Sequence, residues 1–442
     1  MFSIKQLFNR YRGLPKEIYV LFIARVINSI GAFVFPLLTL ILKEKIGLSE
    51  EQAGLCMFII ALSMFPFMFL GGKLADSFGR KKLIVIFQLL GASTYIACGL
   101  IAPSMTTVYL IGLASNFYAM SFPALDSMAM DITSKDNRKE AYSVLYMGHN
   151  LGFAIGPMLG GLLYRNNLPF VFIGDALTTI IATVLMLIFI KETMPRKGQH
   201  QRLPSGNENE LEKHQTGTVL KILFKERPVL LFYALILMIY EFSYNQWAFT
   251  LPLQINDIFG LSGAQYFGFL ASFNGILVII FTPLITTLTR KMHPLIAIGI
   301  GGIAYTASFA AMGLINELAL FFIATFVMTM GEIVAAVNGS PFVANHSPAS
   351  HRGRINSFIQ FTSGIGRTCA PLMGYVIAAT NMMISWFVIA GVVGFGAIMM
   401  FLLRRMKTRA DLQAATPAVQ TPGQETIPVP VPEPEYIPSD PS

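Results

Sequence analysis

The chain has 442 residues, of which 54% are hydrophobic and only 13% are charged, and its formal net charge is +8. Soluble proteins carry roughly 25% charged residues, and a single core stops growing beyond about 250–300 residues, so most of this chain must lie in lipid. This excludes a soluble enzyme and a free nucleic-acid-binding protein, and it makes the positive charge a signal of membrane topology.

Apolar runs of about 20 residues, the length that crosses a bilayer, follow one another along the chain. The first half contains six of them, near residues 17–42, 52–72, 83–102, 108–131, 141–164 and 170–190. The second half contains six more, near residues 229–252, 264–288, 294–314, 318–342, 354–379 and 383–404. The sequence therefore predicts an all-α integral membrane protein with twelve transmembrane helices in two six-helix bundles.

Two long segments outside these runs are polar. Residues 192–228 are rich in Lys, Glu, Asn and Gln, and residues 406–442 are Pro-rich and cannot build a core. The polar and basic residues 1–16 do not have the pattern of a cleavable signal peptide. We therefore expect an N-terminal bundle over 1–191, a cytosolic linker over 192–228, a C-terminal bundle over 229–405 and a disordered tail over 406–442.

The positions of Lys and Arg predict the orientation in the membrane, because cytoplasmic segments carry an excess of both. Of the 32 Lys and Arg residues, 27 fall in the N-terminal arm, the loops after the second, fourth, eighth and tenth runs, the linker and the start of the tail. Three lie in the opposite loops, and Arg25 and Arg367 lie within apolar runs. This distribution predicts that both termini are cytoplasmic and that the protein resides in the plasma membrane, most simply that of a bacterium.

An internal repeat supports the division into two bundles. A shift of 214 residues superposes four pairs of identical residues, namely Arg138 and Arg352, Gly152 and Gly366, Pro157 and Pro371, and Gly160 and Gly374. Two bundles of one plan, related by an axis along the membrane normal, are typical of alternating-access transporters.

The loop after the second run carries a spaced motif with Gly72, Asp76, Gly79 and Arg80. The glycines allow a tight turn and a close approach of helices. The motif resembles G-x-L-A-D-x-x-G-R-K of the major facilitator superfamily, except for Ser77, where that family often has a basic residue. The resemblance implies that Asp76 and Arg80 form a charge relay that holds the two bundles together on the cytoplasmic side, with Asp131 as its third member.

The fifth run carries glycines spaced so that one helix face is smooth enough for another backbone to pack closely. The motif consists of Gly152, Gly156, Pro157, Gly160 and Gly161. It resembles the antiporter motif of drug/proton exporters in the same superfamily, and the eleventh run holds only a partial copy. The fourth run departs from that family: it has Ala114, Ser115 and Asn116 where many proton antiporters have an arginine.

Charged side chains within membrane spans are costly and are therefore candidates for function. The candidates for proton or substrate coupling are Glu241, Glu332, Asp126, Arg25 and Arg367. A carboxylate removed from water can take up and release a proton near neutral pH, and it can also hold a cationic substrate in competition with that proton. The arginines have a structural alternative, because Arg25 can reach the interface or pair with a carboxylate and Arg367 can neutralise Glu241 or Glu332.

Three further features of the spans have both a functional and a structural interpretation. Asp175 is expected to cap or anchor the sixth helix, and His149, which could shuttle protons, to be a packing residue. Aromatic side chains that could form walls for flat, lipophilic cations cluster in the fourth and seventh runs, namely Tyr118, Phe122, Tyr240, Tyr244, Trp247 and Phe249.

The sequence lacks phosphate-binding loops, nucleophile elbows and metal-type cysteine spacing. We therefore predict a protein that is not an enzyme, binds no metal or cofactor and uses a proton gradient as its energy source. Its predicted function is the export of lipophilic, cationic small molecules in exchange for protons. The expected partners are substrate, protons and membrane lipid, without nucleic acid, and the expected state is a monomer.

Two alternatives remain open from the sequence. The first is the same fold exporting an endogenous metabolite or moving a glycolipid between leaflets. The second is a membrane receptor or scaffold that presents its Pro-rich tail to polyproline-binding partners.

Overall fold

The computed structural model describes residues 13–134, 137–194, 222–347 and 352–415, and the regular elements in these ranges are all helices. The chain divides into one compact unit, Met1–Arg404, and a second unit, Arg405–Ser442. The helices lie in the first unit, apart from the last residues of α18, the final helix (Met382–Ala415).

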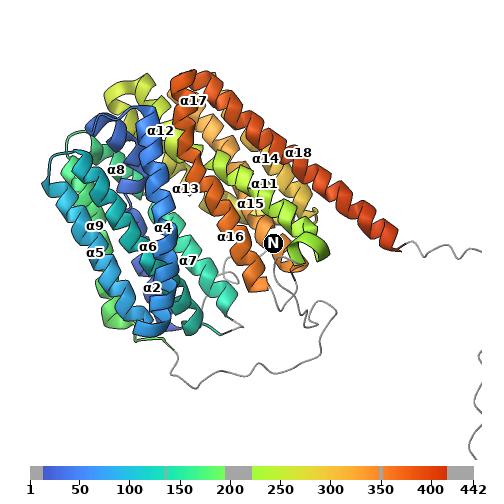
Figure 1. Cartoon of the computed structure of the whole chain (residues 1–442), viewed down its shortest axis with the longest axis horizontal. Coiled ribbons are helices and arrows are strands. Elements are labelled where there is room, and N and C mark those ends of the chain that lie inside the picture. Colours follow the sequence, from blue (N-terminus) through green and yellow to red (C-terminus); the bar gives the residue numbers. More distant parts are fainter. Residues whose placement is uncertain (1–12, 135–136, 195–221, 348–351, 416–442) are drawn as a thin grey trace, which may run out of the picture. The chain divides into compact units, whose positions relative to one another are not determined.

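The first half of this unit forms a group of helices coloured from blue to green in Figure 1. In chain order they are α2 (Lys16–Ile30), α3 (Val34–Leu40), η1 (Ile41–Lys45), α4 (Glu50–Phe78), α5 (Arg80–Leu100), α6 (Met105–Ile132), α7 (Arg138–Phe153), α8 (Gly156–Tyr164) and α9 (Leu168–Phe189). The predicted runs 17–42 and 141–164 are therefore broken helices, because α2 is separated from α3 and α7 from α8.

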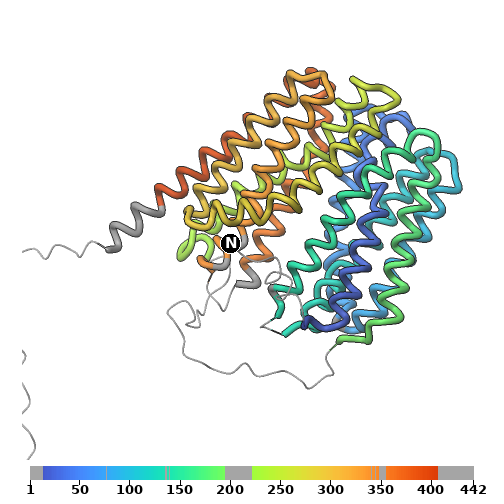
Figure 2. Tube along the Cα trace, turned by 180° about the vertical axis from the view of Figure 1, so that it is seen from behind, coloured from blue at the N-terminus to red at the C-terminus, as the bar shows by residue number. Residues whose placement is uncertain are grey.

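The second half forms a group that lies beside the first in the views from both sides (Figures 1 and 2). Its elements are η2 (Ile222–Glu226), α11 (Pro228–Tyr244), α12 (Gln246–Phe259), η3 (Gly260–Ser262), α13 (Gly263–Thr289), α14 (Pro294–Met312), α15 (Leu318–His346), α16 (Arg352–Cys369), η4 (Ala370–Leu372), α17 (Met373–Ala379) and α18. Helix α18 continues to Ala415, beyond the expected end of the bundle at residue 405. The rest of the expected tail, 416–442, and most of the expected linker, 195–221, lie outside the described residues.

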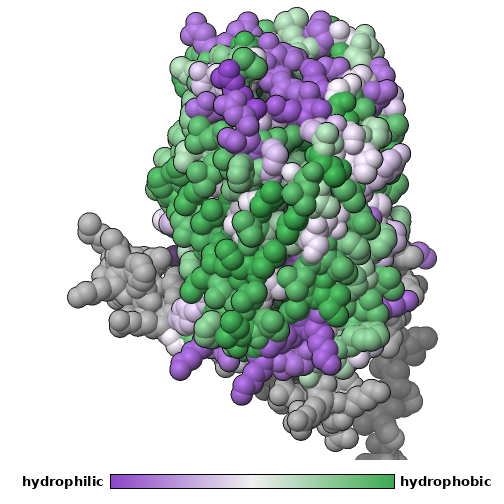
Figure 3. Space-filling view, turned by 90° about the vertical axis from the view of Figure 1, so that its left-hand side faces the viewer, coloured by the Kyte–Doolittle hydropathy of each residue, from purple (hydrophilic) through white to green (hydrophobic). Residues whose placement is uncertain are grey.

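Nine helical stretches of the described chain are long and apolar enough to cross a membrane. One of them, Pro228–Thr289, has 62 residues and contains α11, α12 and α13. Figure 3 shows a broad apolar belt on one face, with hydrophilic residues gathered at the two ends. The protein is therefore a multi-pass membrane protein, and the number of twelve passes stays a prediction.

The bounds of the helices repeat with the same shift of 214 residues that relates the two sequence halves. Helix α2 ends at Ile30 and α11 at Tyr244, while α7 begins at Arg138 and α16 at Arg352. The starts of α9 and α18 differ by the same number of residues. The interruption of α2–α3 also has its counterpart between α11 and α12 at Asn245. The two halves are thus built on one plan, including the positions of their broken helices.

A buried carboxylate explains the break between α2 and α3. Asp175 lies within α9, and its Oδ2 accepts hydrogen bonds from the backbone N–H groups of Phe33 and Val34, both at 3.1 Å. The first N–H groups of a helix have no partner inside the helix, so Asp175 supplies one for α3. The expectation that Asp175 caps or anchors its own helix is thereby corrected.

The two halves meet where α3 packs on α12, α8 on α13, and α4 on α17. Two equivalent contacts require glycine: a Cβ at Gly54 would lie 2.1 Å from the carbonyl oxygen of Pro371, and one at Gly268 would lie 2.4 Å from that of Pro157. The shift of 214 residues converts one contact into the other. The interface between the halves therefore follows the internal symmetry of the sequence.

An ion pair lies on the axis of this symmetry. Lys43 Nζ is 2.9 Å from Asp257 Oδ1 in the other half and 2.7 Å from Glu50 Oε1 in its own half. Positions 43 and 257 are themselves 214 residues apart. We call the end of the unit that contains this pair the Lys43 end, and the opposite end, where α4 joins α5, the Gly79 end.

Candidate functional site

The junction of α4 and α5 holds the first of the two sequence motifs. Gly79 has φ +96°, a backbone conformation that favours glycine, and it ends α4 and begins α5. Arg80 Nε lies 3.0 Å from Asp131 Oδ2 at the end of α6, so these two members of the expected relay are in contact. The side chain of Asp76 lies outside the part of the chain that the structure describes.

Glu192, which the sequence reasoning did not single out, completes this junction. Its Oε1 accepts a hydrogen bond from the backbone N–H of Arg80 at 2.9 Å, and its Oε2 accepts one from Lys81 N–H at 3.2 Å. A carboxylate at a helix N-terminus satisfies free N–H groups and interacts favourably with the helix dipole. The segment after α9 is thereby joined to the start of α5. The only sign of Glu192 in the sequence is that it lies two residues after an apolar run.

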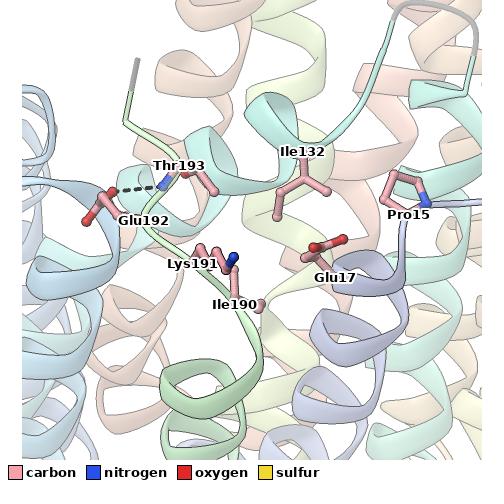
Figure 4. Close-up of a pocket in the computed structure, with 7 residues that line it drawn as sticks. All are labelled: Pro15, Glu17, Ile132, Ile190, Lys191, Glu192 and Thr193. Atoms are coloured by element: carbon pink, nitrogen blue, oxygen red, sulfur yellow. Dashed lines mark hydrogen bonds between the residues drawn. The ribbon is translucent and has the colours of Figure 1, made fainter. Parts of the chain in front are cut away.

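A small pocket lies beside this junction (Figure 4). It has a volume of about 220 Å³ and is lined by Pro15, Glu17, Ile132, Ile190, Lys191, Glu192 and Thr193. The side chains of Glu17 and Lys191 point toward the same space. Sites for drug-sized ligands occupy roughly 300–1,000 Å³, so this pocket is too small to hold such a molecule.

The glycines of the second motif pack against helices from both halves. A Cβ at Gly152 would lie 2.4 Å from Ser29 Cβ, and one at Gly156 would lie 2.6 Å from the carbonyl oxygen of Ser29. A Cβ at Gly161 would instead lie 2.4 Å from the carbonyl oxygen of Ala264 in α13. The motif is therefore a contact surface for α2 in its own half and for α13 in the other half, and α7 ends within it.

Three polar residues of the first half gather on one face formed by α2, α6 and α7. Arg25 interacts electrostatically with Asp126 and with His149, and His149 Nδ1 lies 3.0 Å from Ser29 Oγ. Arg25, Asp126 and His149 are all exposed in the unit. His149 is therefore hydrogen-bonded but not enclosed in packing as expected.

In the second half, Glu241 of α11 and Arg367 of α16 form a pair. Glu241 Oε2 lies 3.6 Å from Arg367 Nη1, and their side chains are 26% and 46% exposed. Of the two carboxylates that Arg367 was expected to be able to neutralise, it contacts Glu241. Both sit where α11 and α16 run side by side.

Glu332 of α15 has uncharged hydrogen-bond partners. Its Oε1 accepts a hydrogen bond from Tyr244 O–H at 3.0 Å, and its Oε2 accepts one from Asn274 Nδ2 at 2.8 Å. Within the described ranges, no Lys, Arg or His forms an ion pair or hydrogen bond with this carboxylate. Tyr146 of α7, in the other half, lies near it. Glu332 therefore faces the first half with only neutral donors around it.

The candidate carboxylates outnumber the arginines near them. Asp126 has Arg25 nearby and Glu241 has Arg367, which leaves the negative charge of Glu332 without a basic neighbour in the described structure. A site with one surplus carboxylate suits a monovalent cation or a proton, because either restores neutrality in a low-dielectric setting.

The predicted aromatic cluster separates into two kinds of residue. Trp247 and Phe249 are 5% and 0% exposed and belong to the core, so they cannot form the wall of a cavity as expected. Tyr240 is also buried, and its O–H donates to the carbonyl oxygen of Ile298. Phe122 is 43% exposed, and Tyr244 binds Glu332.

Comparison with known proteins supports a membrane transporter. The sequence model of the Major Facilitator Superfamily matches residues 21–371 and 295–434. The chain is 26% identical to the class B tetracycline resistance protein of Escherichia coli, over 87% of this chain and 96% of that protein. It is 23% identical to the Na(+), Li(+), K(+)/H(+) antiporter of Planococcus maritimus, over 78% of this chain and 85% of that protein.

Solved structures show the same fold at lower identity. The crystal structure of the peptide transporter POT in complex with sulfate matches with a TM-score of 0.72 at 16% identity, over 92% of this chain and 99% of that chain. The human organic anion transporter MFSD10 matches with a TM-score of 0.61 at 16% identity, over 87% of this chain. At these identities the likeness concerns the fold and not the transported molecule.

Proposed function

The chain belongs to the Major Facilitator Superfamily, and from this membership we propose that it exports lipophilic, cationic small molecules in exchange for protons. The transporter has twelve membrane-spanning helices, with both termini in the cytoplasm, and works as a monomer in the cytoplasmic membrane of a bacterium. Its relatives include a tetracycline resistance protein and a cation/proton antiporter, which is consistent with this type of exchange.

The surplus charge of Glu332 is the observation that carries the proposal. A proton and a substrate cation each neutralise this carboxylate, and they cannot both occupy it. Competition for one carboxylate is sufficient for exchange, because occupation by either ligand biases the equilibrium between two conformations. Asp126 and Glu241 are weaker candidates because each has an arginine nearby.

The conformation described here suits release of the proton and loading of substrate from one side. The two halves are in contact at the Lys43 end, and we assign the Gly79 end to the cytoplasm because the basic residues gather there. Reorientation would close the Gly79 end, with Asp76, Arg80 and Asp131 in the relay that the family motif implies, and open the Lys43 end. The glycines at 152, 156 and 161 let α7 and α8 move against α2 and α13.

The proton gradient supplies enough energy for this work without ATP or another cofactor. Exchange of one proton for one monovalent cation moves no net charge, so the pH difference drives it, and each pH unit releases about 1.4 kcal/mol, which corresponds to a roughly tenfold concentration ratio. One proton per cycle therefore supports considerable export.

The proposal is tested by ethidium uptake into inside-out vesicles that contain the protein and carry an imposed pH gradient, acid inside. We expect uptake by the wild type, collapse of uptake when nigericin removes the pH gradient, and loss of uptake with Glu332→Gln. Glu317→Gln is the matched control, since Glu317 precedes the same helix and is exposed. Uptake by Glu332→Gln equal to that of the control would contradict the role of Glu332. Uptake by the wild type that ignores the pH gradient would contradict proton coupling.

A further inference from the structure

Helix α13 is in contact with both halves of the unit. On one side it packs on α15 of its own half, and on another side it packs on α7 and α8 of the first half. A Cβ at Gly275 would lie 3.0 Å from Ala154 Cα, so the two backbones approach closely there. The polar residue Asn274 directly precedes Gly275. Any change at Asn274 therefore acts next to a contact between the halves.

The side chain of Asn274 is buried, with 3% exposure. Its Nδ2 donates to Glu332 Oε2 at 2.8 Å and to Thr329 Oγ1 at 2.9 Å. Both hydrogen bonds go to α15. Among the described residues, Asn274 therefore connects the Glu332 carboxylate to α13, the helix that contacts the other half.

Other polar groups face Glu332 from each neighbouring helix. Tyr244 and Glu241 lie near it on α11, Tyr305 on α14 and Tyr146 on α7. None of these groups is on α13, where Asn274 is the partner of Glu332. The side chain that connects this carboxylate to α13 is therefore an amide, which carries no charge and does not itself exchange a proton.

Loading a proton on Glu332 changes what its oxygens can do. A charged carboxylate accepts hydrogen bonds at both oxygens, whereas the protonated form has one O–H donor. Hydrogen bonds to an ionised group are roughly twice as strong as those between neutral groups. The link from α15 to α13 through Asn274 therefore weakens or rearranges when Glu332 is neutralised.

We infer that Asn274 is a positioning residue that transmits the charge state of Glu332 to α13 and so to the contact of α13 with α7 and α8. Asn274 can have this role only if Glu332 exchanges charge as proposed. Glu332 is on α15, whereas the contact with the first half is formed by α13. The role of Asn274 explains how neutralisation of this carboxylate can alter that contact.

The test measures the opening of the Gly79 end by the distance between two spin labels. The labels replace Ser77, near the end of α4, and Lys291, two residues after the end of α13, both of which are exposed. The native Cys56, Cys98 and Cys369 are replaced by alanine. Distance distributions are recorded for the wild type, Glu332→Gln, Asn274→Ala and the double variant. Binding of tetraphenylphosphonium by Asn274→Ala shows that this variant is folded.

We expect Glu332→Gln to change the ratio of the two distance populations about fivefold, the effect of roughly 1 kcal/mol in one hydrogen bond, and to have no effect when Asn274 is already alanine. The matched control is Asn338→Ala, because Asn338 Nδ2 also links α15 to α13, through Thr289 Oγ1 at 3.2 Å, but does not touch Glu332. In this control the effect of Glu332→Gln should persist.

Two results would overturn the role of Asn274. One is an undiminished effect of Glu332→Gln in the Asn274→Ala background, and the other is an equal loss of that effect in the Asn338→Ala background, which would indicate general loosening of α13 and α15. Failure of the proposed function appears elsewhere, as ethidium uptake that survives Glu332→Gln. The two failures are therefore distinguishable.

Discussion

At the scale of single residues, the carboxylates of the membrane helices differ in what compensates their charge. Neutralising Glu241 leaves Arg367 without its partner at 3.6 Å, whereas neutralising Glu332 alters the hydrogen bonds of the uncharged Tyr244 and Asn274 and leaves no basic side chain of the described residues without its partner. A stranded charge is costly in a membrane protein. Loss of transport in Glu332→Gln would therefore report on Glu332 itself and not on a neighbouring charge left behind.

Asp175 provides a prediction about stability. Replacing it by alanine leaves the buried N–H of Val34 without an acceptor, at a cost of about 1–3 kcal/mol, while Phe33 N–H keeps the carbonyl oxygen of Gly31 at 2.7 Å. Asp175→Asn retains an oxygen in the same place and should cost less. The measurement is thermal unfolding of the purified protein, followed by a thiol-reactive dye that labels Cys98, which is 2% exposed in the folded state. Equal unfolding temperatures for the two variants would contradict the role of Asp175 as a cap.

The candidate residues could be predicted from the sequence only in part. Glu241, Glu332 and Arg367 are visible because a charge in an apolar run is rare. Asn274 and Glu192 are not, because a single Asn in a span, or a Glu after one, has no meaning until the fold places it beside its partner. The partner of Glu332 is 58 residues away in the sequence, and no spacing rule connects them.

At the scale of elements, the broken helices form the contacts between the halves. Helices α3, α8, α12 and α17 are all the shorter, second parts of interrupted spans, and each contacts the opposite half. A break lets the second part of a span tilt independently of the first. These short parts therefore meet the opposite half either at one another, as α3 and α12 do, or at a long helix, as α8 does at α13 and α17 does at α4.

Gly152 and Gly391 form a matched pair of positions for testing how closely the helices pack. A Cβ at Gly152 would lie 2.4 Å from Ser29 Cβ and 2.6 Å from the carbonyl oxygen of Val26, while one at Gly391 would have nothing within 4 Å. We expect Gly152→Ala to destabilise the protein by about 1–3 kcal/mol through overpacking, and Gly391→Ala to leave stability unchanged or to raise it by up to about 1 kcal/mol through helix propensity. Thermal unfolding checks both. A Gly152→Ala protein as stable as Gly391→Ala would show that α2 and α7 do not pack as described.

The sequence predicts the elements better than their interruptions. Apolar length locates the runs near 17–42 and 141–164, but the break at Phe33 depends on Asp175, which is 142 residues away. The motif at 152–161 did mark close packing, because glycine spacing is a local property. Which helices it packs against is decided by the fold and could not be predicted from the spacing.

At the scale of the whole compact unit, the internal symmetry organises the Lys43 end. Lys43 and Asp257 occupy equivalent positions in the two halves and bind each other across the axis at 2.9 Å. Glu50 also holds Lys43, at 2.7 Å, from its own half. When this end opens, Lys43 loses Asp257 but keeps Glu50, so the opening does not leave a lysine without a partner.

Replacing Lys43 by Gln should therefore favour opening of the Lys43 end. The pair is partly exposed, with 21% and 50% of the two side chains accessible, so we expect an effect of about 0.5–1 kcal/mol, or a two- to fivefold change in population. Spin labels at Thr106 and Leu320, which are exposed residues near the equivalent starts of α6 and α15, report the distance across this end.

Lys45→Gln is the control for this prediction. Lys45 lies two residues away but contacts the ring of Tyr164 and the carbonyl oxygen of Arg165, both in its own half. The label distances should stay as in the wild type. Equal widening in the two lysine variants would mean that loss of positive charge at this end, and not the bond to Asp257, controls the opening.

Exchange at Glu332 is tested most directly by the proton movement that substrate causes in reconstituted vesicles. The protein is placed in vesicles with an acid interior, a lipophilic cation such as ethidium is added outside, and the internal pH is followed with a fluorescent weak base. We expect alkalinisation of the interior by the wild type and by Glu317→Gln, and none by a Glu332→Gln protein whose thermal unfolding matches that of the wild type. Alkalinisation by Glu332→Gln at the rate of the wild type would contradict the assignment of this carboxylate as the site of exchange.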